Sequence, residues 1–155
     1  MTPITRHPSM LIPQTLLVAS GPFGPRLPAS GVAAAIARGL QDGGLPEPDL
    51  CPLPLPDEDG ADALVLLDAL DFDARMRRAR AVVVGAERLE ERTLAGSVTF
   101  EIATRARQGG VPAYAVTGAN ALGPFDARIL DLQVILEARS ARALVAAGRK
   151  LAGLV

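Results

Sequence analysis

A run of four apolar residues without polar alternation, Ala81–Val84, constrains the fold of this chain most strongly. Three of the four are valines, whose β-branched side chains favour strands. A strand with one exposed face alternates apolar and polar residues, whereas this run is apolar throughout. We therefore expect a strand that is covered on both faces, as in a parallel sheet. Gly85 follows the run, and the strand is expected to end there because the backbone must turn.

A cluster of charged residues comes directly after this predicted strand: Glu87, Arg88, Glu90, Glu91 and Arg92. Ligands of open α/β sheets bind beyond the carboxyl ends of the strands, so the charged segment is a candidate binding site. The alternative is a solvated loop in which the acids and arginines pair with one another for little free energy.

Strand and helix patterns alternate along the rest of the chain. Strands are predicted at 16–19, 49–55, 81–84, 112–116 and 130–136. Helices are predicted from Ser30 to Gly43, from 63 to 79 with a break near Asp71, from 95 to 108, and from Ser140 onward. Prolines alternate with apolar residues in the second strand, so this strand belongs at a sheet edge.

This order predicts an α/β fold with a doubly wound, mostly parallel sheet and helices on both faces, a Rossmann-like arrangement of three layers. The 155 residues are expected to form one domain at 14–155 after a mobile leader at 1–13.

Composition excludes several classes of function. With 16 basic and 17 acidic residues and a net charge of −1, the chain lacks the basic surface that binds nucleic acid or an anionic membrane. No apolar run approaches the ~20 residues that span a bilayer. Cys51 is the only cysteine, which indicates a reducing compartment and a cytoplasmic location. His7 is the only histidine, which argues against histidine-based metal sites and catalytic triads.

A loop rich in glycine and proline, 20–30, follows the first predicted strand. Glycine-rich turns in this position often bind phosphate. This loop has neither the dinucleotide nor the P-loop spacing and contains no lysine. Its three prolines also remove backbone donors, so a rigid structural loop is the favoured interpretation. A third segment, Thr117–Asn120, is expected to form a turn at the same sheet edge.

Four carboxylates lie close together at 57–62. They could hold a divalent cation through oxygen ligands. The alternative is that these acids precede a helix and interact favourably with its dipole.

Residues 19–29, with Phe23 and Leu27, and residues 54–62, with Asp57, are similar to two motifs of one known family. That family is the glycerate kinase family, which phosphorylates glycerate with ATP. The first family motif is close to A-P-D-S-F-K-G-S-L-S-A and aligns with 19–29, where Phe23 and Leu27 match. The aspartate and lysine of that motif fall on Gly21 and Gly24. The second motif is close to P-M-A-D-G-G-E-G-T and aligns with 54–62, where Asp57 matches.

A third motif of this family, close to T-G-E-G-R-L-D-x-Q-T-L-x-G-K, aligns with 84–97. Glu90 replaces its aspartate, and Ser97 replaces its lysine. The matching residues are Gly85, Arg88, Leu89, Thr93, Leu94 and Gly96.

The resemblance implies ATP and Mg²⁺ as cofactors. Asp57 and Glu90 would hold the metal, and Arg88 would contact phosphate as a third catalytic residue. Nucleotide-binding residues would be Gly85, Thr93, Gly96 and Gly118. Family members also carry an inserted second domain, and here Asp62–Leu70 bridges the place where it would leave and return.

Three functions follow as hypotheses. The favoured one is a degenerate, non-catalytic relative that binds a small anion or a protein partner. The second is a surviving ATP-dependent kinase acting on glycerate or a similar hydroxy acid, with its cleft rebuilt by a homodimer. The third is a structural homo-oligomer, because an excised domain leaves former interface exposed.

Overall fold

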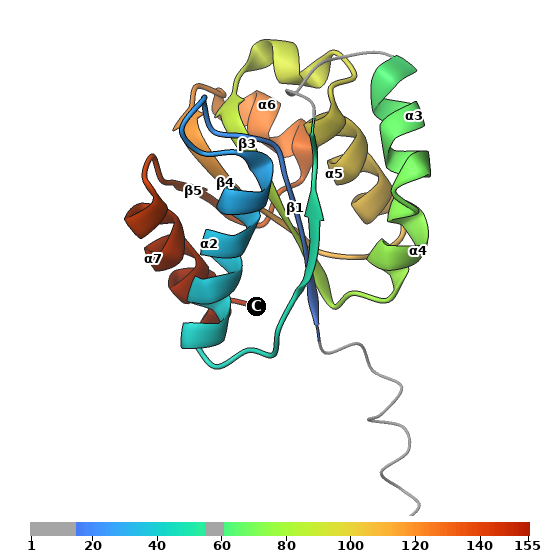
Figure 1. Cartoon of the computed structure of the whole chain (residues 1–155). Helices are drawn as coiled ribbons and strands as arrows, with labels where there is room; N and C mark the ends of the chain where they lie inside the picture. The colour runs from blue at the N-terminus through green and yellow to red at the C-terminus, as the bar shows by residue number, and fades with distance from the viewer. Residues whose placement is uncertain (1–14, 55–60) are drawn as a thin grey trace, which may run out of the picture.

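The computed structural model describes residues 15–54 and 61–155, which form a five-stranded sheet with helices on both faces (Figure 1). The strand order is β2-β1-β3-β4-β5, and every neighbouring pair is parallel. This confirms the predicted doubly wound parallel sheet. The strands are β1 (Leu16–Ser20), β2 (Asp49–Pro52), β3 (Ala81–Leu89), β4 (Ala113–Asn120) and β5 (Ile135–Glu137).

The helices divide between the two faces of the sheet (Figure 1). Helices α2 (Ala29–Asp42) and α7 (Ala141–Ala152) pack against each other on one face. On the other face lie α3 (Ala61–Ala69), α4 (Phe72–Arg77) and α5 (Val98–Gln108). The remaining helices of the described residues are the 3₁₀ helix η2 (Glu91–Leu94) and α6 (Pro124–Leu130).

Successive side chains of an apolar strand point alternately into the two cores on opposite faces of the sheet, so these strands are buried on both faces. In β1, Val18 packs with the α2 and α7 side, whereas Leu17 and Ala19 pack with the α3, α4 and α5 side. The same alternation holds for Val83 and Val84 in β3. A continuous apolar run is the sequence that this double burial requires.

Several predicted features are confirmed. The helical segment predicted at 63–79 is broken at Asp71. The backbone of Asp71 is left-handed, with a φ of 54°, and lies between α3 and α4. Strand β2 lies at the sheet edge, as its prolines predicted. The Ser140 hydroxyl caps α7 by accepting a hydrogen bond from the Ala143 N–H at 3.1 Å. Among the described residues, no helix is both long and apolar enough to cross a membrane.

The predicted ends of three strands were wrong. Strand β2 ends at Pro52 and not at residue 55. Strand β3 continues past Gly85 to Leu89, and β4 includes the Thr117–Asn120 segment that was expected to turn. Both extensions arise because the two strands keep pairing as far as Leu89 and Asn120. The charged segment after the valine run therefore starts inside a strand.

Three other boundaries also differ from the predictions. Helix α2 starts at Ala29 after Pro28, so Ser30 lies inside it and is not its cap. The helix expected from residue 95 starts at Val98, because the Ser97 hydroxyl caps it. The strand expected at 130–136 is shorter, and only β5 forms. Helix α6 occupies 124–130, and Asp131, with a φ of 54°, is its C-cap.

Candidate functional site

A cavity of about 1020 Å³ opens at the carboxyl ends of the strands. Its walls come from the loop after β1, from the second half of β3 and from the end of β4, with further residues of η2, α5 and the loop before α7. Strand order reverses between β1 and β3, and such switch points are where doubly wound sheets bind ligands. The three segments that were singled out as candidates on this edge thus line one cavity.

The floor of the cavity is backbone because glycines lie where the strands meet. A Cβ added to Gly118 would lie 2.7 Å from the Glu87 carbonyl oxygen. A Cβ on Gly85 would overlap the side chain of Ser20, its partner in β1. Gly85 and Gly118, two of the predicted nucleotide contacts, both line the cavity. Both glycines are buried, and the absence of a side chain lets the neighbouring strand ends lie close together at the cavity.

Three of the five backbone N–H groups in the glycine- and proline-rich loop at 21–28 donate hydrogen bonds to backbone carbonyls of the protein. The Gly21 N–H donates to the Gly85 carbonyl at 3.0 Å, and the Phe23 N–H donates to the Leu27 carbonyl at 2.8 Å. The Leu27 N–H in turn reaches the Gly24 carbonyl at 3.4 Å. Three further residues are prolines without an N–H. The loop is therefore organised to hold its own shape and has few amides left for a phosphate.

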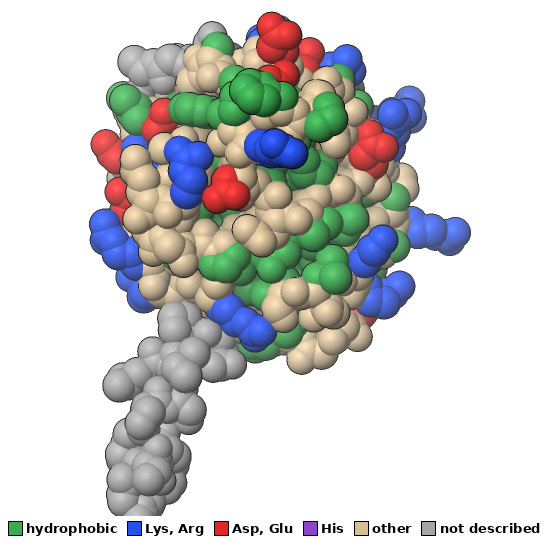
Figure 2. Space-filling view, turned by 180° about the vertical axis from the view of Figure 1, so that it is seen from behind, with side chains coloured by type: hydrophobic (Ala, Val, Ile, Leu, Met, Phe, Trp, Pro, Cys, Tyr) green, Lys and Arg blue, Asp and Glu red, His purple; other side chains and the backbone are tan. Residues whose placement is uncertain are grey.

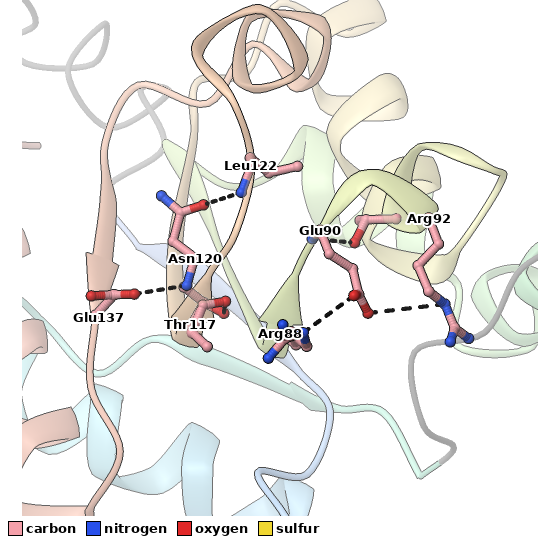
Figure 3. Close-up of polar contacts among 9 residues, drawn as sticks. Arg88, Glu90, Arg92, Thr117, Asn120, Leu122 and Glu137 are labelled. Atoms are coloured by element: carbon pink, nitrogen blue, oxygen red, sulfur yellow. Dashed lines mark hydrogen bonds and ion pairs between the residues drawn. The ribbon is translucent and has the colours of Figure 1, made fainter.

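Arg88 and Arg92 both point toward Glu90 at the junction of β3 and η2 (Figure 3), and all three residues line the cavity. The Glu90 carboxylate accepts a hydrogen bond from Arg88 Nε at 3.2 Å, and its second oxygen lies 4.0 Å from Arg92 Nε. Arg139 lines the cavity from the loop before α7 and donates from Nε to the Gly118 carbonyl at 2.7 Å. Together with Glu87, the wall carries three arginines and two glutamates, an excess of positive charge that suits an anion.

The N-terminus of α5 also reaches the cavity, through Ser97, Val98 and Thr99. Ser97 is buried, and its hydroxyl accepts from the Phe100 N–H at 3.1 Å and donates to the Thr93 carbonyl at 2.8 Å. Thr93 Oγ1 accepts from the Glu90 N–H at 3.0 Å. These bonds fix the entry to the helix, whose dipole favours negative charge in the cavity.

The end of β4 is held by a separate set of hydrogen bonds (Figure 3). The Asn120 N–H donates to Glu137 Oε2 at 2.7 Å, and Asn120 Oδ1 accepts from the Leu122 N–H at 3.1 Å. The buried Thr117 hydroxyl donates to the Ala119 carbonyl at 3.1 Å. This rim keeps Gly118 in place beside Arg139.

The structure brings together most of the predicted site residues. Gly85, Arg88, Glu90, Thr93 and Gly118 all line the cavity. Gly96 connects η2 to α5 with a φ of 92° and lies outside the cavity lining of the described residues.

The predicted metal ligands give no Mg²⁺ site that we can build from the structure. Asp57 lies outside the described residues. Glu90 is paired with Arg88, a cation that a metal would have to displace. Within 15–54 and 61–155, no group of three or more His, Cys, Asp or Glu residues is placed to hold a metal ion.

Sequence reasoning did not identify Arg139 as a site residue. It belongs to no motif, and it lies between β5 and the Ser140 cap of α7. One signal could have found it, because Arg139 follows the last predicted strand and the carboxyl ends of parallel strands meet at one edge.

Comparison with known proteins adds a family assignment. The model of the glycerate kinase family matches residues 58–140, which is more than half of the chain. No curated protein matches the sequence. Among solved structures, the "putative glycerate kinase 2 from Salmonella typhimurium LT2" is 18% identical with a TM-score of 0.46, and the match covers 59% of this chain. The match spans only about a quarter (26%) of the length of that structure.

Proposed function

Because this chain belongs to the glycerate kinase family, we propose that it binds a small anion in the cavity and does not transfer a phosphoryl group. One observation carries the proposal. The resemblance places the two motif lysines of the family at Gly24 and Ser97, and both of these residues line the cavity. The site has thus lost two cations at its wall while arginines remain around it.

Anion binding is supported by the charge and shape of the site. Arg88, Arg92 and Arg139 face a cavity whose volume lies at the upper end of the usual range for small-molecule sites. Guanidinium groups bind carboxylates and phosphates through paired hydrogen bonds. The N-terminus of α5 adds a favourable dipole. A small phosphorylated or carboxylated molecule is the ligand class that fits these groups.

The case against phosphoryl transfer comes from what such a reaction needs. Transfer depends on positioning and on cations that stabilise the charge of the migrating group. Ser97 cannot supply that charge, and its hydroxyl is already bonded within the helix cap. Gly24 has no side chain, and the loop around it bonds mainly to itself.

Isothermal titration calorimetry tests the proposal with three ligands: inorganic phosphate, glycerate, and ATP with Mg²⁺. We expect at least one anion to bind, and Arg88→Gln to weaken binding by about three- to tenfold, the size of a partly exposed charge interaction. Arg77→Gln removes an exposed arginine of α4 outside the cavity and is the matched control. A coupled assay for ATP-dependent phosphorylation of glycerate accompanies the titrations. Turnover would overturn the non-catalytic part of the proposal, and absence of binding by all three ligands would overturn the rest.

A second proposal is that the chain self-associates. Apolar side chains are exposed on two helices that both contact α5: Leu64 and Val65 on α3, and Phe125 and Ile129 on α6. Phe125 is 74% exposed, which is unusual for a phenylalanine. Figure 2 shows apolar side chains gathered between charged ones on the face seen from behind. Sedimentation equilibrium at micromolar concentration tests this proposal, and a monomer would contradict it.

A further inference from the structure

We infer that Glu90 is an internal competitor for the anion, because its carboxylate binds the same arginines that the ligand would bind. The inference rests on the proposed anion-binding function and adds a control on its affinity. A ligand that enters the cavity would have to displace the Glu90 carboxylate from Arg88 and Arg92.

The geometry of the three side chains carries the inference. The two carboxylate oxygens of Glu90 point to different arginines, Oε1 to Arg88 Nε at 3.2 Å and Oε2 to Arg92 Nε at 4.0 Å (Figure 3). All three residues line the cavity. A carboxylate between two guanidinium groups has the charge and hydrogen-bonding pattern of an anionic ligand. Glu90 therefore occupies the positions that a bound carboxylate or phosphate would take.

The Glu90 side chain also takes part in a capping box at the start of η2, in which it accepts from the Thr93 N–H. The Glu90 N–H donates to Thr93 Oγ1 at 3.0 Å, and the Glu90 carbonyl accepts from the Thr93 N–H at 2.9 Å. These two bonds do not use the carboxylate and would remain if it moved. The side chains of Arg88 and Arg92 are 57% and 77% exposed, and ion pairs of this kind are weak. The carboxylate can therefore be displaced from its arginines at small cost, and a glutamine in its place would keep an oxygen for the cap.

The third arginine of the site behaves differently. Arg139 Nε donates to a backbone carbonyl, that of Gly118, and not to an acid. Among the described residues no ion pair joins Arg139 to an acid, so an anion at Arg139 would displace no such pair, whereas one at Arg88 and Arg92 would. The competitor consequently acts on one side of the cavity, and removing its charge should strengthen binding through the two arginines of that side only.

The test is the affinity for inorganic phosphate of Glu90→Gln at fixed ionic strength. Glutamine keeps the size of the side chain and removes its negative charge. We expect phosphate to bind about three- to tenfold more tightly than to the wild type, the range set by a partly exposed ion pair. Glu91→Gln is the matched control, because it changes the net charge equally at an exposed neighbour outside the cavity lining. We expect it to change the affinity less than twofold by the screening of exposed charges.

A second comparison separates competition from a general charge effect. In a variant that already carries Arg88→Gln and Arg92→Gln, adding Glu90→Gln should bring no more gain than adding Glu91→Gln. Thermal unfolding of each variant without ligand checks that the fold is retained.

The outcomes distinguish the two proposals. If wild type binds phosphate and Glu90→Gln binds it no more tightly than Glu91→Gln does, the competitor role is overturned while anion binding stands. If no anion binds wild type or any folded variant, the proposed function itself fails. Binding that tightens in Glu90→Gln and loses this gain in the double-arginine background supports the inference.

Discussion

Ser20 and Gly85 lie opposite each other in the neighbouring strands β1 and β3, and no side chain fits at Gly85 beside the Ser20 side chain. Ser20 is fully buried, and its hydroxyl donates to the Gly21 carbonyl at 2.8 Å. The contact lies where both strands meet the floor of the cavity. It explains why a glycine follows the apolar first half of β3, Ala81–Val84.

Replacing Gly85 with alanine should destabilise the fold. The added Cβ would overlap Ser20 Oγ and lie 2.7 Å from Ser20 Cβ, so the two strands would have to separate. We expect Gly85→Ala to lower the free energy of unfolding by about 1–3 kcal/mol, as overpacking does in other cores. Urea unfolding measures this change. The double variant Ser20→Gly/Gly85→Ala should recover part of the loss, and a double variant no more stable than Gly85→Ala would contradict the steric explanation.

Two glycines of α2 should respond in opposite directions to alanine. Gly39 faces α7 so closely that a Cβ would lie 2.7 Å from the Arg149 N and 2.9 Å from the Gly148 Cα, both backbone atoms. Gly31→Ala would instead make ordinary contacts of 3.5 and 3.6 Å with the Pro28 ring. We expect Gly39→Ala to lose about 2 kcal/mol or more from helix separation. Gly31→Ala should gain about 0.5–1 kcal/mol from helix propensity.

Thermal unfolding of these two alanine variants side by side provides the measurement. Equal midpoints would contradict the close packing of α2 on α7.

Arg75 connects α4 to the edge strand β2 through bonds that a lysine cannot reproduce. Its Nε and one terminal nitrogen pair with Asp49 at 3.0 and 2.8 Å, and that nitrogen also reaches the Leu50 carbonyl at 2.7 Å. The hydrogen bond with Asp49 raises the pKa of Arg75. We expect Arg75→Lys to cost about 1–2 kcal/mol, since a bidentate pair becomes a single contact.

The control for Arg75 is Arg77→Lys, which changes an exposed residue of the same helix. Chemical denaturation of both variants measures the difference. A loss for Arg77→Lys as large as that for Arg75→Lys would contradict the role of the pair.

Cys51 should make stability fall at alkaline pH. Burial raises the pKa of its thiol, and the nearby Arg75 charge opposes that shift less strongly. The folded protein therefore holds the thiol proton more tightly than the unfolded chain, whose thiol has a pKa of about 8.5. As pH rises above that value, the unfolded chain loses the proton first, so stability falls until the pH reaches the raised folded-state pKa.

The free energy of unfolding of wild type and of Cys51→Ala is measured by denaturation between about pH 7 and pH 10, a range that brackets the pKa of a free thiol. The difference between the two pH profiles isolates the contribution of Cys51. The wild type should lose more stability with rising pH than the variant, by at most about 1.4 kcal/mol per pH unit. Parallel pH profiles would contradict the prediction. The constant offset caused by the lost side-chain volume does not affect this comparison.

Arg139→Gln should weaken anion binding although no sequence motif marks this residue. Its guanidinium lines the cavity and is held to Gly118 by a 2.7 Å hydrogen bond, so its charge is oriented before a ligand arrives. We expect about a three- to tenfold loss of phosphate affinity. Arg142→Gln, an exposed arginine of α7 outside the cavity lining, is the control. Equal affinities in the two variants would show that Arg139 does not contact the ligand.

The sheet could be predicted because its signals are local. The valine run, the alternating prolines of β2 and the Ser140 cap each fix an element within a few residues. The ends of the strands could not be predicted, because β3 and β4 are lengthened by pairing between Ala86–Leu89 and Thr117–Asn120. Helix α6 was missed since 124–130 lies next to an apolar run that looks like a strand.

The candidate site shows the same division. Motif resemblance made Gly85, Arg88, Glu90 and Thr93 candidates, and Gly118 was a candidate because it follows a predicted strand. The structure gathers all five at one cavity. The pairing of Glu90 with two arginines could not be predicted, because which charges meet depends on how η2 turns back beside the end of β3.

By itself, the sequence determined a doubly wound parallel sheet, since double burial requires apolar strands and the helices between them leave few possible topologies. Only the tertiary structure decided which residues share the cavity. Arg139 is separated from Arg88 by about fifty residues of chain, and parallel strands alone bring their carboxyl ends to one edge. Local patterns fix which elements form, whereas contacts between distant segments fix the site.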